Sequence, residues 1–516
     1  MRRKLRHVKN NFLGIMKNLP ESYILSNTKK WLAFFAISLV TTMINLDITV
    51  ANLAVASIAK TFHASLSQMQ WVINVYMLSG IIFLIIAGRL ADIFGRKNIY
   101  LMGIGLFLLA SIVIVMAPNI VVLIAGRTLQ GMGLAFTLTL GIILVTSIFP
   151  ENKRGFALGS YMTVAGLAQA LGPTVGGAIL QFLSWRWIFV INMPLSLLAL
   201  VFVTLFCPKD KAAASGESID FTGIAILGLG LTLLALGLNE IDQWGISAVL
   251  CIVAGLMVLV VFYGQSKRVR HPLIKFGLFK NRVYTLTNII RTFHMYGQFA
   301  VFFILPLYLQ NVLNESPFIT GAMLFCMTIP FVLISPFVGL WLDRVGFVLP
   351  TKVALFLTLV AFLLLTQLGA ILSLPLLISA LVLLGIGAPI IGSSTPALSL
   401  SALPEKDRGA GMGAFYMFAF FGSLIGVAIS GALLAFLSEY HFCSIALPRL
   451  LHFSDVLRAL HGTSSIQSLT KLTNQAELVV AVKNSFVYGF KAVMWVNVGL
   501  VLIALCLCRG LAKGVK

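Results

Sequence analysis

The chain has 516 residues, of which 59% are hydrophobic and only 10% are charged. A soluble globular domain is about half apolar and about a quarter charged, so this composition excludes an ordinary soluble enzyme. The net charge is +21, from 37 Lys and Arg against 16 Asp and Glu. In so apolar a chain, this excess predicts that the basic loops contact anionic lipid headgroups and that no nucleic acid is bound.

Residues 1–30 precede the first apolar run and are rich in Lys and Arg. Their few apolar residues recur at helical spacing: Leu5, Val8, Phe12, Ile15 and Leu19. This pattern predicts a cytoplasmic amphipathic helix on the inner leaflet, with a disordered basic tail as the alternative. The first apolar run is too long for the core of a signal peptide, so it is expected to remain as the first span.

Apolar runs long enough to cross a bilayer recur along the rest of the chain. A helix needs about 20 residues to cross the hydrocarbon, and the runs predict fourteen helices in an all-α polytopic membrane protein. The predicted spans are 31–58, 71–91, 99–117, 119–147, 156–182, 187–206, 221–239, 246–264, 284–310, 317–341, 351–371, 374–402, 410–437 and 485–508. The polar residues 438–484 between the last two spans predict a long outer loop.

The distribution of basic residues predicts the orientation. With the N-terminus in the cytoplasm, 28 of the 37 Lys and Arg fall on the cytoplasmic side and seven on the outer side. Basic loops stay in the cytoplasm, so this ratio predicts a multi-pass protein of the cytoplasmic (inner) membrane. An even number of spans returns the basic tail 509–516 to the cytoplasm.

The sequence repeats itself at an interval of about half its length. Pro150-Glu-Asn-Lys-Arg-Gly155 matches Pro404-Glu-Lys-Asp-Arg-Gly409. Such self-similarity predicts two parallel six-helix bundles, 31–206 and 284–508, with 207–283 holding two inserted helices and a basic loop. Parallel halves are one known transporter architecture, in which the substrate site lies between them.

A second match joins two loops on the cytoplasmic side. Gly88-Arg-Leu-Ala-Asp-Ile-Phe-Gly-Arg-Lys97 faces Gly339-Leu-Trp-Leu-Asp-Arg-Val-Gly346. The glycines permit a tight turn and close helix contact. A merely basic loop is the alternative, but the repetition favours a conformational gate. The residues predicted for this gate are Gly88, Arg89, Asp92, Gly95, Arg96 and Asp343.

These residues carry a resemblance to a known family. The first loop resembles the signature loop of the major facilitator superfamily. Leu46-Asp-Ile-Thr-Val-Ala-Asn52 resembles the first-helix motif of its 14-helix drug:proton antiporters, and Leu123-Ile-Ala-Gly-Arg-Thr-Leu-Gln-Gly-Met-Gly133 resembles the fourth-helix motif of proton-coupled members. Ala168-Gln-Ala-Leu-Gly-Pro-Thr-Val-Gly-Gly177 resembles the fifth-helix antiporter motif. The resemblance implies a multidrug-efflux antiporter driven by the proton motive force.

Two charged residues lie deep in predicted spans. Asp47 is the only acid well inside any span, and Arg127 lies in the fourth. A carboxylate in mid-membrane costs about 2.5–3.5 kcal/mol, so such residues usually serve a function. Counted from the outer helix ends, Asp47 lies roughly 16 Å deep and Arg127 roughly 10 Å deep, which permits contact. We predict that this pair couples transport to a proton, with purely structural roles as the alternative.

The fifth-helix motif predicts close packing. Ala168, Gly172 and Gly176 recur every four residues and form a small-residue face. Pro173 interrupts the backbone hydrogen bonds, and Gly177 extends the run of small residues. A generic packing motif shares this spacing, but the resemblance favours a helix that seals the interface against leak.

The second half carries no buried acid. Its first span holds Arg291, His294 and Gln298, which with Gln130 are the candidates for substrate binding. Alternatively, and with equal weight, the Arg291 side chain extends to the lipid headgroups of the inner leaflet and does not bind substrate. One acid among several bases predicts neutral, amphipathic or anionic lipophilic cargo rather than dications.

No other function class is favoured. No span carries a nucleophile–base pair, a phosphate loop or metal-ligand spacing, so we expect no enzyme, no metal and no cofactor apart from the coupling proton. The alternatives are an exporter of an endogenous metabolite such as a siderophore, and an uptake symporter. A channel is a weaker alternative, because a two-fold repeat with a single proton site suits alternating access. A periplasmic adaptor and an outer-membrane channel stay open as partners.

Overall fold

The structure is a computed structural model of the chain. It describes residues 27–149, 154–208, 220–269, 272–404, 408–445 and 476–511. The predicted amphipathic helix of the basic tail lies outside these residues, as do the middle of the predicted outer loop and most of the tail 509–516.

The first bundle is built from six membrane helices, the last of which is broken. Its elements are α2 (Asn27–Phe62), α3 (Leu66–Phe94), α4 (Arg96–Val115), α5 (Ile120–Ile148), α6 (Arg154–Phe182), α7 (Arg186–Val190) and α8 (Asn192–Phe206). The predicted span 187–206 is thus divided at Ile191. Pro194 explains the break, because it has no backbone N–H to donate to the preceding turn.

The inserted pair and the second bundle follow. The inserted elements are α9 (Phe221–Asn239), the short α10 (Ile241–Trp244) and α11 (Ile246–Ser266). The second bundle comprises η3 (Phe276–Lys280), α12 (Arg282–Leu307), η4 (Tyr308–Val312), α13 (Pro317–Val345), α14 (Val348–Leu365), α15 (Leu374–Ser401), α16 (Arg408–Ile445) and α19 (Ala476–Leu511). The wider turns of η4 follow Pro306.

Length and composition agree with the predicted spans. Within the described residues, 13 helices are long and apolar enough to cross a membrane, and the 29-residue α3 completes the fourteen. The predicted span 351–371 is wrong at its end, because α14 stops at Leu365. The residues that follow include Gly369, and Pro375 then begins the next helix, which leaves a longer turn than expected. The segment 438–484 is helical at both ends, as far as Ile445 and from Ala476.

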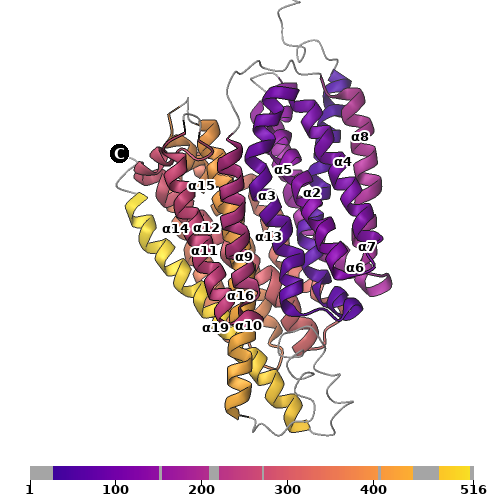
Figure 1. The fold of residues 1–516 in the computed structure, drawn as a ribbon, viewed down its shortest axis with the longest axis vertical. Helices are drawn as coiled ribbons and strands as arrows, with labels where there is room; N and C mark the ends of the chain where they lie inside the picture. The colour runs from indigo at the N-terminus through magenta and orange to yellow at the C-terminus, as the bar shows by residue number, and fades with distance from the viewer. Residues whose placement is uncertain are drawn as a thin grey trace, which may run out of the picture.

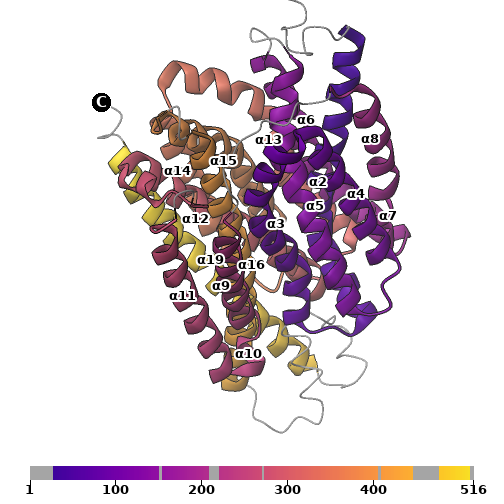
Figure 2. The ribbon, with the colours of Figure 1, turned by 45° about the horizontal axis from the view of Figure 1, so that its top comes forward.

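The two bundles stand side by side. Figure 1 shows α2–α8 in indigo and purple beside the orange and yellow helices of the second bundle, with the start of α2 and the end of α19 at the same end. We call this the proximal end and the opposite one the distal end. In Figure 1, α16 and α19 reach farthest at the distal end, and Figure 2 shows the two bundles side by side from a second angle.

The bundles contact each other through small residues. A Cβ atom built on Gly177 of α6 would lie 2.8 Å from the carbonyl oxygen of Pro317 in α13, and one on Gly321 would overlap the carbonyl of Pro173. Between α3 and α16, a Cβ on Gly431 would overlap the Gln70 side chain. These contacts lie toward the distal end, so the bundles are closed together there.

Equivalent glycines turn the chain in the two matching loops. Gly95, between α3 and α4, has φ 88°, and Gly346, between α13 and α14, has φ 75°. Each backbone N–H donates to the helix before it, Gly95 to Ala91 O and Gly346 to Leu342 O, both at 2.9 Å. Because side chains other than Gly rarely adopt such φ values, this geometry explains why both loops keep a glycine there.

The inserted pair is attached to the first bundle by polar contacts. The indole Nε1 of Trp71 in α3 donates to Glu240 Oε1 at 3.0 Å, and the Ser67 hydroxyl donates to the same oxygen. One turn further, Asn74 Nδ2 donates to Asn239 Oδ1 at 3.1 Å. The same helix, α9, also packs on α16 of the second bundle.

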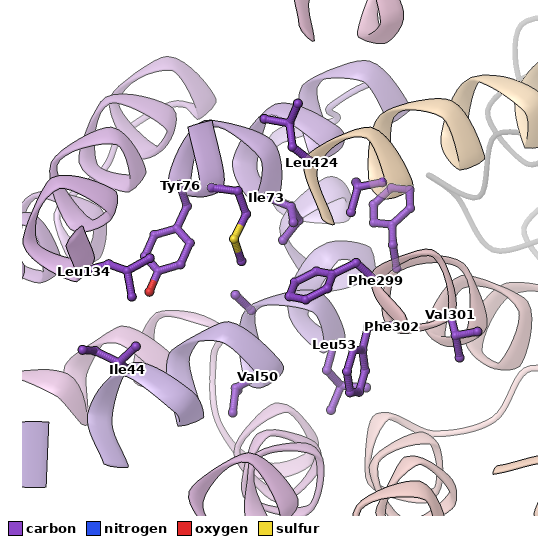
Figure 3. Packing of buried hydrophobic residues seen from close by; sticks show 14 of the residues in the cluster. Ile44, Val50, Leu53, Ile73, Tyr76, Leu134, Phe299, Val301, Phe302 and Leu424 are labelled. Atoms are coloured by element: carbon purple, nitrogen blue, oxygen red, sulfur yellow. The ribbon is translucent and has the colours of Figure 1, made fainter. Parts of the chain in front are cut away.

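Apolar side chains fill the space between the bundles. Figure 3 shows Leu53 of α2 and Tyr76 of α3 on one side, with Phe299 and Phe302 of α12 on the other. All of them are nearly fully buried. The polar side chains described next lie beside this apolar packing.

Candidate functional site

The two deep charges predicted from the sequence form an ion pair. Arg127 Nη1 of α5 lies 2.6 Å from Asp47 Oδ2 of α2. Asp47 is 2% exposed and Arg127 is 1% exposed. Because both charges are removed from solvent, each depends on the other for compensation.

Further partners hold the guanidinium of Arg127. Its Nε donates to the backbone oxygen of Val72 at 3.1 Å, and its Nη1 also donates to Gln130 Oε1 at 2.8 Å. Its Cζ lies 4.1 Å from the centre of the Tyr76 ring and 5.8 Å from that of Phe189. Aromatic faces attract cations, so the two rings stabilise the positive charge of Arg127.

The carboxylate of Asp47 has a second donor. Asn192 Nδ2, at the start of α8, donates to Asp47 Oδ1 at 3.0 Å. Asn192 is fully buried, and it lies directly after the break that Pro194 imposes. The carboxylate thus binds Arg127 through one oxygen and Asn192 through the other. We call Asp47, Arg127, Asn192 and Gln130 together the ion-pair site.

Gln130 belongs to this network rather than to a cavity wall. Besides accepting from Arg127, it donates through Nε2 to the Ser111 hydroxyl of α4 at 3.0 Å. Gln130 and Ser111 are both fully buried. One turn of α5 beyond Arg127, Gly131 lets α5 approach α3, since a Cβ there would overlap the carbonyl oxygen of Tyr76. This approach brings Arg127 within reach of Val72.

The small-residue face of α6 lies next to Asp47. A Cβ on Gly172 would overlap the hydroxyl of Thr49, and one on Gly176 would lie 2.6 Å from Val50 Cγ1. Thr49 and Val50 follow Asp47 by two and three positions on α2. Pro173, between the two glycines, presents its carbonyl to α13. One helix therefore contacts both the segment beside the ion pair and the opposite bundle.

Two hollows lie away from the ion-pair site. The first, with an empty volume of about 230 Å³, lies between the bundles and is lined by Gly166, Gln169, Gln298, Phe302, Met327, Thr328, Phe331 and Ala388. The second, of about 390 Å³, lies within the second bundle and is lined by Phe293, His294, Gln298, Met327, Leu355, Thr358, Phe362, Leu384, Ala388, Val501 and Ala504. These volumes count all the space between atoms, and each hollow has room for only about one water molecule in all.

The predicted substrate-binding residues of α12 lie in different environments. His294 and Gln298 line the second hollow, and Gln298 also lines the first. Arg291 lines neither and is half-buried, with Nη1 3.8 Å from where a Cβ of Gly392 would stand. Its side chain therefore reaches toward α15 of its own bundle.

The structure does not describe the side chains of most residues of the predicted gate. Those of Gly88, Arg89, Asp92 and Asp343 are not described, so the contact among them stays a prediction. Gly95 has the backbone geometry given above, and Arg96 begins α4.

Sequence reasoning missed Asn192, Tyr76 and Phe189 at the ion pair, and Gln169 at the first hollow. Asn192 had a signal, since it is a lone amide inside an apolar run and lies two residues before a proline. Gln169 stands within the quoted motif of the fifth helix. The two aromatic rings had no signal that separates them from ordinary core residues.

Comparison with known proteins identifies the family. The model of the Major Facilitator Superfamily matches residues 35–427. The riboflavin transporter RibZ of Clostridioides difficile is 30% identical over 383 residues, which cover 74% of this chain and 83% of that protein. The tetracenomycin C resistance and export protein of Streptomyces glaucescens is 28% identical over 79% of this chain and 76% of its own length.

A third relative and a solved structure agree. The multidrug resistance protein Stp of Mycobacterium tuberculosis is 29% identical over 79% of this chain and 76% of its own length. Among solved structures, a bacterial homologue of the human lysosomal transporter Spinster superposes with a TM-score of 0.64 at 14% identity, over 95% of this chain and 99% of that one. The chain belongs to the Major Facilitator Superfamily. It is a multi-pass membrane transporter, and the predicted fold is confirmed.

Proposed function

We propose that the protein is a proton-coupled antiporter that exports lipophilic or amphipathic small molecules by alternating access. The observation that carries this proposal is the buried ion pair of Asp47 and Arg127. Burying two charges in an apolar bundle is unfavourable in free energy, so such residues usually have a function. Proton binding by the carboxylate is a function of this kind. The relatives named for multidrug resistance and for tetracenomycin export support the direction of transport.

Proton binding at Asp47 would change the balance of charge in the first bundle. A protonated Asp47 leaves Arg127 as a buried cation without an anion, which is unfavourable in low dielectric. Arg127 then keeps only its uncharged partners, the Val72 carbonyl and Gln130, unless it moves toward water or another anion. Proton uptake is therefore favourable only together with a rearrangement of α2 and α5, which links the proton to the conformational cycle.

The proposed location follows from the basic loops. We propose the cytoplasmic membrane, with both termini inside, so that the distal end faces outward. We propose no cofactor beyond the proton. A periplasmic adaptor and an outer-membrane channel are the candidate protein partners. The repeated loops around Gly95 and Gly346 are the proposed gate at the proximal end.

Transport by the purified protein in proteoliposomes tests the proposal. An imposed pH gradient should drive a lipophilic fluorophore against its concentration gradient, with protons moving the opposite way. Collapse of the gradient with a protonophore should stop the movement, and empty liposomes are the control. Cargo that moves in the same direction as the protons would show a symporter instead.

One relative gives a second candidate cargo. Because a relative at 30% identity is a riboflavin transporter, riboflavin is the endogenous metabolite to include in the same assay. Gradient-driven movement of riboflavin, with no movement of unrelated lipophilic dyes, would favour a metabolite carrier over a multidrug exporter.

A further inference from the structure

Side chains from other helices hold α8 at both of its ends. At its start, Asn192 Nδ2 donates to Asp47 Oδ1 at 3.0 Å. At its end, Lys97 Nζ donates to the backbone oxygens of Thr204 at 2.9 Å and Cys207 at 2.6 Å. Lys97 is 7% exposed and stands in the first turn of α4, directly after the loop proposed as the gate. One helix of 15 residues, about 20 Å long, therefore joins the ion-pair site to that loop.

The contact of Lys97 is of the kind that fixes a helix end. The last carbonyl groups of a helix have no partner within it, and they carry the negative end of its dipole. Thr204 lies in the last turn of α8, and Cys207 directly follows that helix. An ammonium group bonded to both oxygens satisfies them and holds this end against α4. Movement at the end of α8 is therefore passed to the first turn of α4.

The break before α8 separates its movement from that of α7. α7 has an attachment of its own, because Arg186 Nε and Nη2 donate to the backbone oxygens of Val115 and Ala117, at the opposite end of α4. Between the two attachments the chain is interrupted at Ile191. Asn192 directly follows this break, so α8 can change its angle to α7 at the residue that contacts the ion pair.

Proton binding at Asp47 changes the bond at the start of α8. A hydrogen bond to a carboxylate is roughly twice as strong as one to a neutral group, so protonation weakens the bond from Asn192. The charged or titratable groups recorded against Asp47 are Arg127 of α5 and Tyr76 of α3. Toward this site, the other helices packed on α2 present uncharged residues: Asn192 of α8, Phe189 of α7, Gly172 and Gly176 of α6, and Phe299 of α12.

We propose that Lys97 is a positioning residue that couples the proton state of Asp47 to the proposed gate through α8. When Asp47 binds a proton, the start of α8 shifts against α2. This shift reaches the loop before α4 because Lys97 keeps the end of α8 attached. Lys97 itself binds neither the proton nor the cargo. The coupling rests on the proposed antiport function, in which Asp47 carries the proton.

The second bundle places a lysine in a similar position. Lys352 is the fifth residue of α14, and it acts electrostatically on Cys508 near the end of α19. The predicted spans of this bundle contain no counterpart of Asp47. Lys352→Met is therefore the matched control for Lys97→Met, because it removes a similarly placed lysine from the bundle without a proton-binding acid.

Distance measurements across the proposed gate test the coupling. Phe94, at the end of α3, and Val345, at the end of α13, are exposed. Both are replaced by spin-labelled Cys in the full chain, with its six native Cys replaced by Ala. Acidification should change the distances between the labels, and Asp47→Asn, alone or with Arg127→Gln, should abolish this change. Lys97→Met should reduce the change at least about tenfold, as expected for loss of hydrogen bonds from a charged donor.

Separating the other end of α8 should have the same effect. Asn192→Leu removes the bond to Asp47 and should reduce the response to acid as strongly as Lys97→Met does. Lys97→Arg should keep most of the response, because a guanidinium can bond both carbonyl oxygens, and Lys352→Met should respond like the parent protein. The proposal is overturned by a full response in folded Lys97→Met or Asn192→Leu, by a response that persists in Asp47→Asn, or by a parent protein that does not respond.

A merely structural role of Lys97 has a different signature. Loss of stability would alter the distances at every pH, whereas loss of coupling removes only their dependence on pH. Gel filtration and thermal unfolding check folding. If Lys97→Met does not fold, Lys97→Gln replaces it, and the Asn192→Leu result decides in either case.

Failure of export is distinguishable from failure of the coupling. Suppose that the gate responds to acid and that Lys97→Met and Asn192→Leu both abolish the response, but that no gradient-driven export occurs. This result contradicts the antiporter and leaves the coupling. Gradient-driven export, with a response that neither substitution affects, contradicts the coupling alone.

Discussion

Replacing Asp47 with Asn should abolish gradient-driven export. The amide occupies the same space and can still accept from Arg127, but it cannot exchange a proton. The structure adds a second effect, because Arg127 is then a buried cation without an anion. Breaking one side of a buried ion pair typically costs about 3–5 kcal/mol of folding stability. Export in proteoliposomes and thermal unfolding of the same preparations measure the two effects.

A double variant separates the two effects. Asp47→Asn combined with Arg127→Gln removes both charges, so stability should largely return while export stays absent. Glu439→Gln in α16 is the matched acid-to-amide control and should transport normally. Gradient-driven export by the folded Asp47→Asn protein would exclude Asp47 as the essential proton carrier.

Replacing Gly172 with Leu should impair transport much more than it impairs membrane insertion. A Cβ at this position already overlaps the Thr49 hydroxyl, so the rest of a leucine side chain must push α6 away from α2. Overpacking of this kind costs about 1–3 kcal/mol, which the large apolar bundle tolerates but a close-packed moving contact does not. Transport per molecule of inserted protein measures the effect.

Two further variants test whether the contact itself matters. Gly105→Leu in α4 is the control, because a Cβ there meets nothing within 4 Å. Gly172→Ala should have an intermediate effect, and Thr49→Ala in the same chain should restore part of the activity by removing the overlapping hydroxyl. Normal transport by Gly172→Leu would show that α2 and α6 do not rely on this contact during the cycle.

The sequence was sufficient to find the two deep charges because they stand out against apolar helices. Asp47 and Arg127 could each be placed by depth, since a helix rises by a constant amount per residue. Their contact could not be derived, because depth says nothing about which way a side chain points around its helix. Asn192 carried a weaker signal, a lone amide two residues before a proline, and its bond to Asp47 depends on a neighbour across the bundle that the sequence does not identify.

The glycine motif shows the same limit. Its spacing of four predicts one small-residue face, and Gly172 and Gly176 do share a face against α2. Gly177, one position later, points elsewhere and contacts α13. The cavity walls were less predictable still. His294 and Gln298 were identified as polar residues on α12, but their surroundings come from four helices that are distant in the sequence.

The ion-pair site and the two hollows have no residue in common. One helix that touches the surroundings of both is α6, through Gly172 and Gly176 beside Thr49 and Val50, and through Gly166 and Gln169 in the wall of the first hollow. Under the function proposed above, cargo recognition outside the ion-pair site can change by substitution while the proposed proton-coupling residues are left intact. Relatives of about 30% identity that are named for riboflavin and for tetracenomycin C illustrate how far cargo diverges within this family.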